Sequence, residues 1–416
     1  MTRLLSPGRS LVFGLLPTAM VLAALQPLNW DARLNDGIAA IQAGNSAEAV
    51  QILSPLLEQA KAFPREDPRL AESTMALAVA YQYNSQFDQA EPLYLEAVQL
   101  LGAGGEKSGS MLALAFENLG QLRLGQGRWQ EAKDFLGKAR DLYSKIGKPD
   151  DRRVANVDRL LGETCLGQGQ IAEAVVLIEH AVDALRQALD VAPSTLAAGL
   201  RSLATAYTVQ GRYPEAEAPL EESIRLTRGT SQTQLDMADG ILALGHLCLL
   251  ERDTARAMPL LQKAVHIFEA HDDSHLSSAL SELGSAALQE GKYAMAKEYL
   301  GRALDINQKL LGWDRLSIAM VQGALAEAYF GERNYGQAAA LIQQAIATDR
   351  AAVGGTHFTM AKLLLIEATI EAKQRRALEA ETHYRQALDI YRRTFAANHP
   401  DLMKAQREYA QFVNNK

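Results

Sequence analysis

The chain has 416 residues, a net charge of −7 and a sequence pI of about 5.7. Hydrophobic residues make up 48% of it but aromatic residues only 6%, and strand-forming residues are scarce, which argues against a β-rich fold. Charged residues, at 22%, are too frequent for a multispanning membrane protein. The absence of any block of lysines or arginines excludes the charge pattern of a nucleic-acid-binding protein.

The first 30 residues have the pattern of an export signal. Arg3 and Arg9 precede a stretch without charges, and residues 11–25 are almost wholly apolar. The residues before Ala23 suit cleavage after that alanine, while Pro17 weakens a stable membrane helix. We expect residues 1–30 to be a cleaved signal peptide or an N-terminal membrane anchor. The protein is then exported (periplasmic or secreted) or attached to a membrane through residues 10–30, and a merely buried helix is the remaining alternative.

An internal repeat occupies the rest of the chain. Each copy has a short segment that ends in alanine after a turn, such as Trp129-Gln-Glu-Ala132 and Tyr213-Pro-Glu-Ala216. The nine marker alanines are spaced 39 to 42 residues apart. They are Ala49, Ala90, Ala132, Ala174, Ala216, Ala257, Ala296, Ala338 and Ala380. Nine copies in phase predict a repeat array instead of several separate cores.

Other positions keep the same phase and indicate a pair of helices in each copy. A glycine or alanine stands 12 residues before each marker alanine, as at Gly120 and Gly162, and in seven consecutive copies it follows a leucine. Small residues allow two helices to approach closely, and the leucines fill the space between them. Glycines such as Gly127 and Gly211 stand at the turn where the first helix must end.

The whole pattern resembles the tetratricopeptide repeat (TPR), whose usual unit has about 34 residues. The longer period is similar to that of kinesin light chains, and two corners, Gly354–His357 and Ala397–Asp401, resemble the Gly-x-x-His-Pro corner of that group. The resemblance implies an all-α, right-handed superhelical solenoid of about nine helix-turn-helix repeats over residues 31–400. A capping helix is expected over residues 401–416, with Asp401 as its N-cap.

The last repeat has the least certain register. Glu367 stands where seven earlier copies have leucine, and Ala377 stands at the aromatic position. A second irregularity lies earlier in the chain. The marker alanines Ala257 and Ala296 are only 39 residues apart, which shortens the corner near His271 and His275.

Few residues suggest chemistry. Cys165 and Cys248 occupy the same column two repeats apart, about 20 Å if packed helices are ~10 Å apart, so we expect buried free thiols. The histidine pair His271 and His275, with the acids between them, is the one metal-like cluster of the sequence. Its spacing matches no closed zinc pattern, so a solvated corner is the preferred interpretation. We therefore predict no catalytic residues, no metal and no cofactor, and a protein that is not an enzyme.

The resemblance places the first helix of each repeat on the concave face of the solenoid, where ligand peptides lie. Arg159 and Arg201 are 42 residues apart, so they should share one face, where guanidinium groups suit a carboxylate partner. A solvated charged face is the alternative. The predicted partner-binding residues are Asn118, Gln121, Asn156, Arg159, Glu163, Arg201, Thr205 and His246.

These observations predict a protein-interaction scaffold that binds a protein or peptide of unknown identity in a concave groove, with no nucleic-acid partner. Two alternatives remain: a structural cell-envelope protein that assembles with itself, and a metal-dependent enzyme with an unrecognised site.

Overall fold

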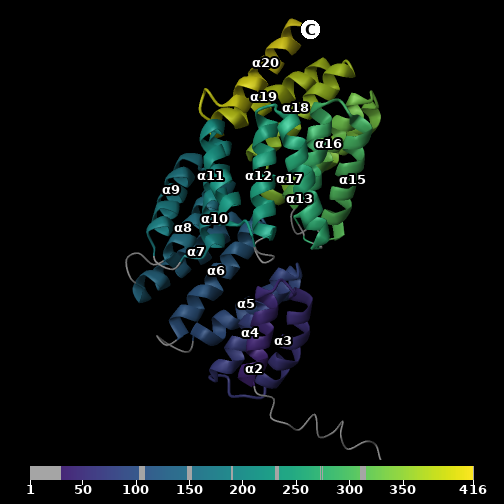
Figure 1. Cartoon of the computed structure of the whole chain (residues 1–416). Helices are drawn as coiled ribbons and strands as arrows, with labels where there is room; N and C mark the ends of the chain where they lie inside the picture. Colours follow the sequence, from purple (N-terminus) through teal and green to yellow (C-terminus); the bar gives the residue numbers. More distant parts are fainter. Residues whose placement is uncertain are drawn as a thin grey trace, which may run out of the picture.

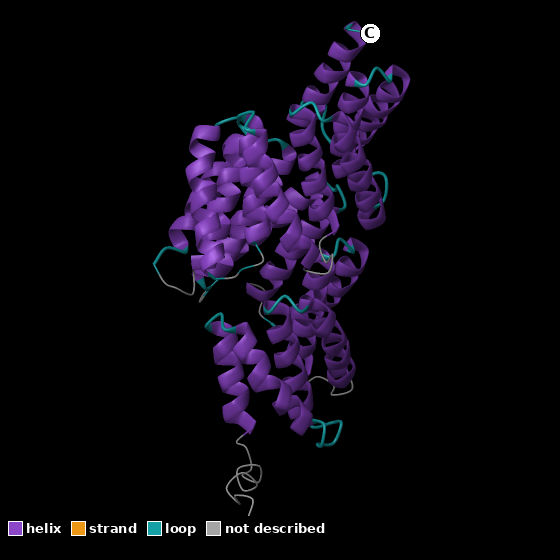
Figure 2. Ribbon diagram, turned by 90° about the vertical axis from the view of Figure 1, so that its right-hand side faces the viewer, coloured by secondary structure: helices purple, strands orange, loops and turns teal. Residues whose placement is uncertain are grey.

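The computed structural model describes residues 30–102, 108–147, 152–188, 191–229, 234–271, 273, 275–309 and 315–415. Within these ranges every regular element is a helix and none is a strand (Figure 2). The fold class predicted from the sequence, an all-α solenoid, is confirmed. The predicted signal peptide or anchor falls outside the described residues, as does most of the glycine-rich segment 102–109.

Eighteen of the helices form nine consecutive helix-turn-helix pairs (Figure 1). The first helices of the pairs are α2 (Trp30–Gln42), α4 (Pro68–Tyr83), α6 (Gly109–Gly125), α8 (Arg152–Gly167), α10 (Pro193–Gln210), α12 (Gln234–Leu250), α14 (Leu276–Gln289), α16 (Arg315–Gly331) and α18 (Phe358–Lys373). The second helices are α3 (Ser46–Ala60), α5 (Phe87–Gly102), α7 (Trp129–Ile146), α9 (Ile171–Gln187), α11 (Tyr213–Leu226), α13 (Thr254–Ala270), α15 (Tyr293–Lys309), α17 (Tyr335–Val353) and α19 (Ala377–Thr394). A last helix, α20 (Pro400–Asn414), follows them.

In the five repeats with glycine at the small position of the first helix, this glycine lies against a leucine or isoleucine 16 positions later in the second helix. A Cβ atom built on Gly120 would lie 2.5 Å from Leu136 Cγ, and one on Gly284 would lie 2.5 Å from Leu300 Cγ. All nine marker alanines are fully buried in the same interface, Ala380 included. The register assigned from the sequence is therefore confirmed in every copy, the irregular last one included.

Each turn inside a pair contains one residue with a positive φ, five positions before the marker alanine. Glycine occupies five of the nine positions, for example Gly211 with a φ of 82°. The other four are Ser85, Arg252, Arg333 and Arg375, with φ between 57° and 67°. Non-glycine residues pay a conformational cost in this region, so the geometry of the turn is imposed by the packing of the two helices.

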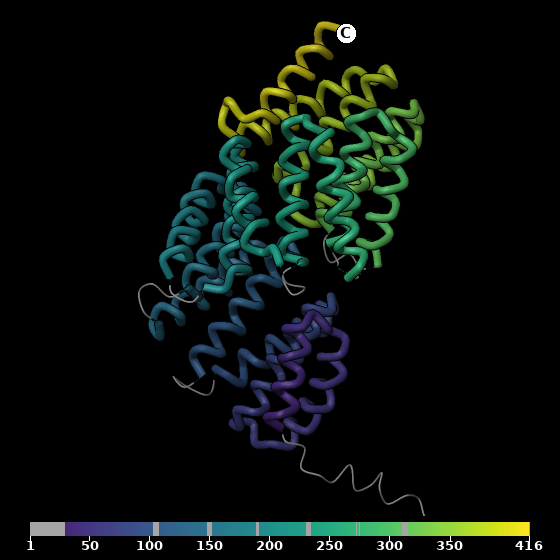
Figure 3. The backbone as a smooth tube through the Cα atoms, viewed as in Figure 1, coloured from purple at the N-terminus to yellow at the C-terminus, as the bar shows by residue number. Residues whose placement is uncertain are grey.

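The superhelix turns far enough for its last repeats to contact earlier ones. In Figure 3 the yellow end of the chain lies across the ends of the teal helices α10 and α11. A Cβ on Gly211 would lie 2.6 Å from Pro400 Cδ, and one on Gly169 would lie 3.5 Å from Thr394 Cγ2. The rings of Trp129 and His357 are 4.9 Å apart. The turns of the third to fifth repeats thus contact the corners that flank the ninth repeat.

Helix α20 packs on the last repeat through aromatic contacts. The ring of Tyr384 in α19 is 5.8 Å from that of Tyr409 and 5.3 Å from that of Phe412. The prediction that Asp401 caps this helix is wrong. His399 is the N-cap, and its side chain accepts a hydrogen bond from the Asp401 backbone N–H, because Pro400 at the first helical position places His399 outside the helix.

Cys165 and Cys248 are buried free thiols, as predicted. In the described residues, no helix combines the length and the apolar character needed to cross a membrane.

Candidate functional site

A cavity of about 680 Å³ lies inside the C-terminal half of the superhelix. The first helices of the sixth to ninth repeats, α12, α14, α16 and α18, form most of its wall, and α20 closes one side. Its apolar lining comprises Leu249, Leu250, Leu288, Phe330, Leu365, Ile366 and Ile370. Because first helices supply these residues, the cavity lies on the face that the sequence predicted to be concave.

The cavity contains several charged side chains without partners. Arg252, Lys362 and Arg407 line it, and none of the three has an ion-pair partner among the described residues. Lys404 also lines it, with its Nζ 3.7 Å from Glu408 Oε1. Cations without an ion-pair partner among the described residues, set beside apolar side chains, suit a ligand that carries carboxylates beside apolar groups.

The pKa of one carboxyl group in the cavity is raised. Burial raises the pKa of Glu327 above its ordinary value, and the charges of Lys362 and Lys404 only partly offset that effect. Burial likewise raises the pKa of the Tyr213 hydroxyl, to about 12. Glu327 can therefore interact with a ligand as a hydrogen-bond donor when protonated or as an anion when ionised.

The column of groove residues predicted from the sequence continues into this cavity. Gln121, Glu163, Thr205 and His246 all stand 11 residues before a marker alanine. The later members of the same column are Ser285, Glu327 and Thr369, and all three line the cavity. Lys362 stands in the column of Asn156 in the same way. Extending the columns to the last repeat would have found these residues, whereas nothing in the repeat pattern indicates Arg407 of α20.

His246 lies on α12 and forms an ion pair with the next first helix. Its Nδ1 is 3.0 Å from Glu282 Oε1. The charge of Glu282 raises the pKa of His246, and His246 in turn holds the pKa of Glu282 below its usual value although burial alone would raise it. Both side chains remain partly exposed, so the pair is accessible to a ligand.

Arg159 is engaged within the chain. It is only 8% exposed, and its guanidinium donates to Asn156 Oδ1 at 3.0 Å and to Glu163 Oε1 at 2.6 Å. Asn156 donates in turn to Glu117 Oε1 at 2.6 Å, and Ser202 of the next repeat donates to Glu163. The carboxylate expected from a partner is thus supplied by Glu163, and Arg159 connects the fourth and fifth repeats.

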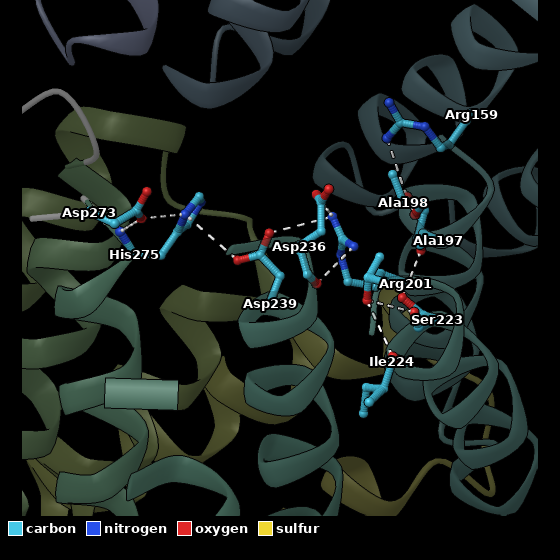
Figure 4. Close-up of polar contacts among 12 residues, drawn as sticks. Arg159, Ala197, Ala198, Arg201, Ser223, Ile224, Asp236, Asp239, Asp273 and His275 are labelled. Atoms are coloured by element: carbon cyan, nitrogen blue, oxygen red, sulfur yellow. Dashed lines mark hydrogen bonds and ion pairs between the residues drawn. The ribbon is translucent and has the colours of Figure 1, made fainter. Parts of the chain in front are cut away.

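Arg201 belongs to a second network, shown in Figure 4. Its Nη2 lies 3.6 Å from Asp236 Oδ1 and 3.4 Å from Asp239 Oδ2. Asp239 Oδ1 is 3.7 Å from His275 Nδ1, which is 2.9 Å from Asp273 Oδ1. This bond to Asp273 is the largest cause that raises the pKa of His275, to about 9. The network links the first helices of the fifth, sixth and seventh repeats.

The remaining predicted groove residues have few contacts. Gln121 is exposed, Asn118 is half-buried, and the Thr205 hydroxyl donates to the Arg201 carbonyl of its own helix at 3.0 Å. Near Asn156, a second cavity of about 570 Å³ is lined by Met111, Leu114, Glu117 and Tyr143 among others. Of the predicted groove residues, Asn156 lines this second cavity, and none is among the residues that line the first.

The histidine corner does not form a three-ligand cluster in the described part of the chain. His271 Nδ1 lies 2.8 Å from the Ile267 carbonyl oxygen of its own helix, whereas His275 faces Asp273 and Asp239. The two imidazoles have separate partners because His271 is the C-cap of α13 and His275 is the N-cap of α14.

Comparison with known proteins agrees with the repeat architecture. Sequence profiles of the tetratricopeptide repeat match residues 111–187, 196–230, 275–351 and 368–401. Two curated relatives from Arabidopsis thaliana, the proteins KINESIN LIGHT CHAIN-RELATED 3 and KINESIN LIGHT CHAIN-RELATED 1, are each 23% identical over 56% of the chain. The aligned region spans only 36% and 38% of these relatives, so it represents about a third of their length.

Solved structures share the fold over nearly the whole chain. The structural alignment with a Rap protein in complex with competence and sporulation factor spans 92% of this chain and 99% of the Rap chain. Its TM-score is 0.63 and the sequence identity is 15%. The alignment with the quorum sensor NprR in complex with its cognate peptide NprX spans 88% of this chain and 99% of the NprR chain. Its TM-score is 0.60 and the sequence identity is 12%. At these identities the likeness concerns the fold alone.

Proposed function

Because the chain belongs to the tetratricopeptide-repeat family, we propose that it is a protein-interaction scaffold whose C-terminal cavity binds an extended, acidic peptide segment without catalysing a reaction. The observation that carries this proposal is the set of cations in the cavity, Arg252, Lys362 and Arg407, which have no ion-pair partner among the described residues. Exposed cations beside apolar side chains favour a ligand that supplies carboxylates, which become desolvated pairs only in the complex.

The shape of the cavity suits a chain segment better than a compact molecule. Its wall runs along four successive first helices, so a ligand can contact each repeat in turn. The fold is shared with NprR, which binds a cognate peptide. This likeness supports a peptide as the ligand but identifies no sequence for it.

The test measures binding to an array of synthetic heptapeptides that differ in the number and position of acidic residues. The variant is Lys362→Glu with Arg407→Glu, which reverses two cavity charges. The matched control is Lys263→Glu with Arg392→Glu, which makes the same change at exposed positions of the second helices α13 and α19.

We expect the wild type and the control to retain acidic peptides, and the cavity variant to lose them by about 30-fold or more, since truncating a desolvated charge pair costs ~2–5 kcal/mol. No preference of the wild type for acidic peptides would contradict the proposal. Equal losses in both variants would show a diffuse effect of net charge and would also contradict it.

We also propose that the protein is exported or anchored at a membrane. The proposal rests on Arg3, Arg9 and the apolar residues 11–25. Mass spectrometry of the protein from its native source should find a mature N-terminus near Ala24, or an intact segment on a membrane-bound product. An intact N-terminus on a soluble cytoplasmic product would contradict both forms.

A further inference from the structure

Acidic or basic residues occupy three positions of the ninth repeat that are mostly apolar in the other repeats. Glu367 stands in the column that has leucine in seven consecutive repeats, and the eighth repeat has Leu325 there. His383 stands where the eighth repeat has Leu341, and Glu371 stands where it has Tyr329. Asp36 in the first repeat and Arg123 in the third are single charged residues in these columns, whereas the ninth repeat has an acidic or basic side chain at all three positions. This combination requires an explanation.

The three side chains converge between α18 and α19. His383 Nδ1 lies 2.7 Å from Glu371 Oε2 and 3.6 Å from Glu367 Oε2. One ligand atom from each residue lies within 4.8 Å of the others. In the described part of the chain this is the one group of three or more such residues that could hold a metal ion.

Burial makes the arrangement costly without a cation. Glu371 is 3% exposed and Glu367 is 9% exposed. Glu367 accepts no hydrogen bond from any described residue, and its one ion-pair contact is the long one to His383. A largely buried carboxylate without a hydrogen-bond donor, close to a histidine and a second glutamate, favours a bound cation.

The neighbouring arginines neutralise the cluster only partly. Arg376 Nη1 is 3.4 Å from Glu371 Oε1, the oxygen that faces away from His383, and Arg376 is also shared with Glu379 at 3.3 Å. Arg350 lies near enough to lower the pKa of Glu367, but burial dominates and raises that pKa overall. The atoms that a cation would contact are therefore Glu367 Oε2, Glu371 Oε2 and His383 Nδ1, which now face one another.

We propose that Glu367, Glu371 and His383 form a binding site for a divalent transition-metal ion of the Zn²⁺ class, which holds α18 to α19. Two carboxylate oxygens and one imidazole nitrogen are accepted ligands for this ion, whose fourth position water can fill. His383 is partly exposed, so the ion has a path from solvent. The i, i+4 spacing of the glutamates places both on one face of α18.

The test titrates Zn²⁺ into the tag-free full chain by calorimetry and follows thermal unfolding with and without the ion. The variant Glu367→Leu with His383→Leu restores the residues that the eighth repeat carries at these positions, so it should fold. The isosteric variant Glu371→Gln is a second test that changes the packing less. His271→Ala is the control, because it removes an exposed imidazole outside the cluster.

We expect one ion to bind per chain and to raise the melting temperature of the wild type and of His271→Ala. The leucine variant and Glu371→Gln should lose affinity by about 100-fold or more, since even changes behind the ligands cost 10–100-fold. Two results would overturn the proposal: no saturable binding of Zn²⁺, Co²⁺ or Mn²⁺ by the wild type, or unchanged affinity in the leucine variant.

Discussion

The Nε2 atom of His399 lies 2.9 Å from the carbonyl oxygen of Val209, although 190 residues separate the two in sequence. Its Nδ1 accepts the backbone N–H of Asp401 at 3.2 Å, so Nε2 carries the hydrogen that Val209 accepts. One side chain thus caps the last helix and connects it to the end of α10. The same residue makes the superhelix close on itself.

Replacing His399 by asparagine should separate these two roles. Asparagine also caps helices well, but its shorter side chain cannot reach Val209. We expect a loss of about 0.5–1.5 kcal/mol in the free energy of unfolding, the usual value of one hydrogen bond. Hydrogen exchange in residues 400–414 should become faster. His271→Asn, at an exposed position, is the matched control, and equal exchange rates in all three proteins would refute the closing role of His399.

The histidine of the other corner, His357, should make the stability of the protein depend on pH. His357 is 8% exposed beside Trp129, and burial lowers its pKa to about 4. In the unfolded chain its pKa is near ~6.5, so between about pH 6.5 and pH 4 the unfolded state binds a proton that the folded state does not. Stability should therefore fall as the pH falls through this window, by up to ~3 kcal/mol for a shift of this size.

The measurement is denaturant unfolding from pH 7 to pH 4 for the wild type and for His357→Asn, which keeps the ability to cap α18. The difference between the two proteins should shrink as the pH falls, because the variant has no imidazole to protonate. Parallel curves over the whole range would show that His357 contributes no pH dependence.

Two glycines of the third repeat should respond oppositely to the same substitution. A Cβ on Gly120 in α6 would lie 2.5 Å from Leu136 Cγ, whereas a Cβ on Gly137 in α7 has no neighbour within 4 Å. Gly120→Ala should therefore lower the free energy of unfolding by ~1–3 kcal/mol through overpacking. Gly137→Ala should raise it by ~0.5–1 kcal/mol, because alanine favours the helix. Thermal melts that change in the same direction would contradict the packing described for the repeat.

The sequence predicted the helix pairs because their packing repeats. Each glycine at the small position meets its large partner 16 positions later, and nine copies make the local pattern visible even where Glu367 interrupts a column. The positive-φ turns were only partly visible, since Arg252, Arg333 and Arg375 adopt them without a glycine.

The closure of the superhelix could not be predicted in this way. The contact between His399 and Val209 depends on the curvature accumulated over several repeats, which no spacing within one repeat encodes. The cavity wall from α20 was missed for the same reason. Arg159 and Arg201 were correctly placed on first helices, but their acceptors, Glu163 and Asp239, come from local geometry that the repeat period does not specify.

Arg159 is not a neutral position for a charge reversal, because it is buried against Glu163 and Asn156. Arg140 is no control for such a change, since its Nε lies 2.6 Å from Oδ1 of the nearly buried Asp158. Arg392, exposed on α19 and without an ion-pair partner among the described residues, is a suitable one.

Arg159→Gln should therefore lower the free energy of unfolding by about 1–3 kcal/mol, because Glu163 and Asn156 lose a charged donor. Arg392→Gln should change it by no more than ~0.5 kcal/mol. A double-mutant cycle adds the variant Glu163→Gln and the double variant. The double variant should lose less free energy of unfolding than the two single variants lose together, since both single changes remove the same ion pair. If Arg159→Gln were as harmless as Arg392→Gln, Arg159 would instead be a free residue of the groove, open to the carboxylate of a partner.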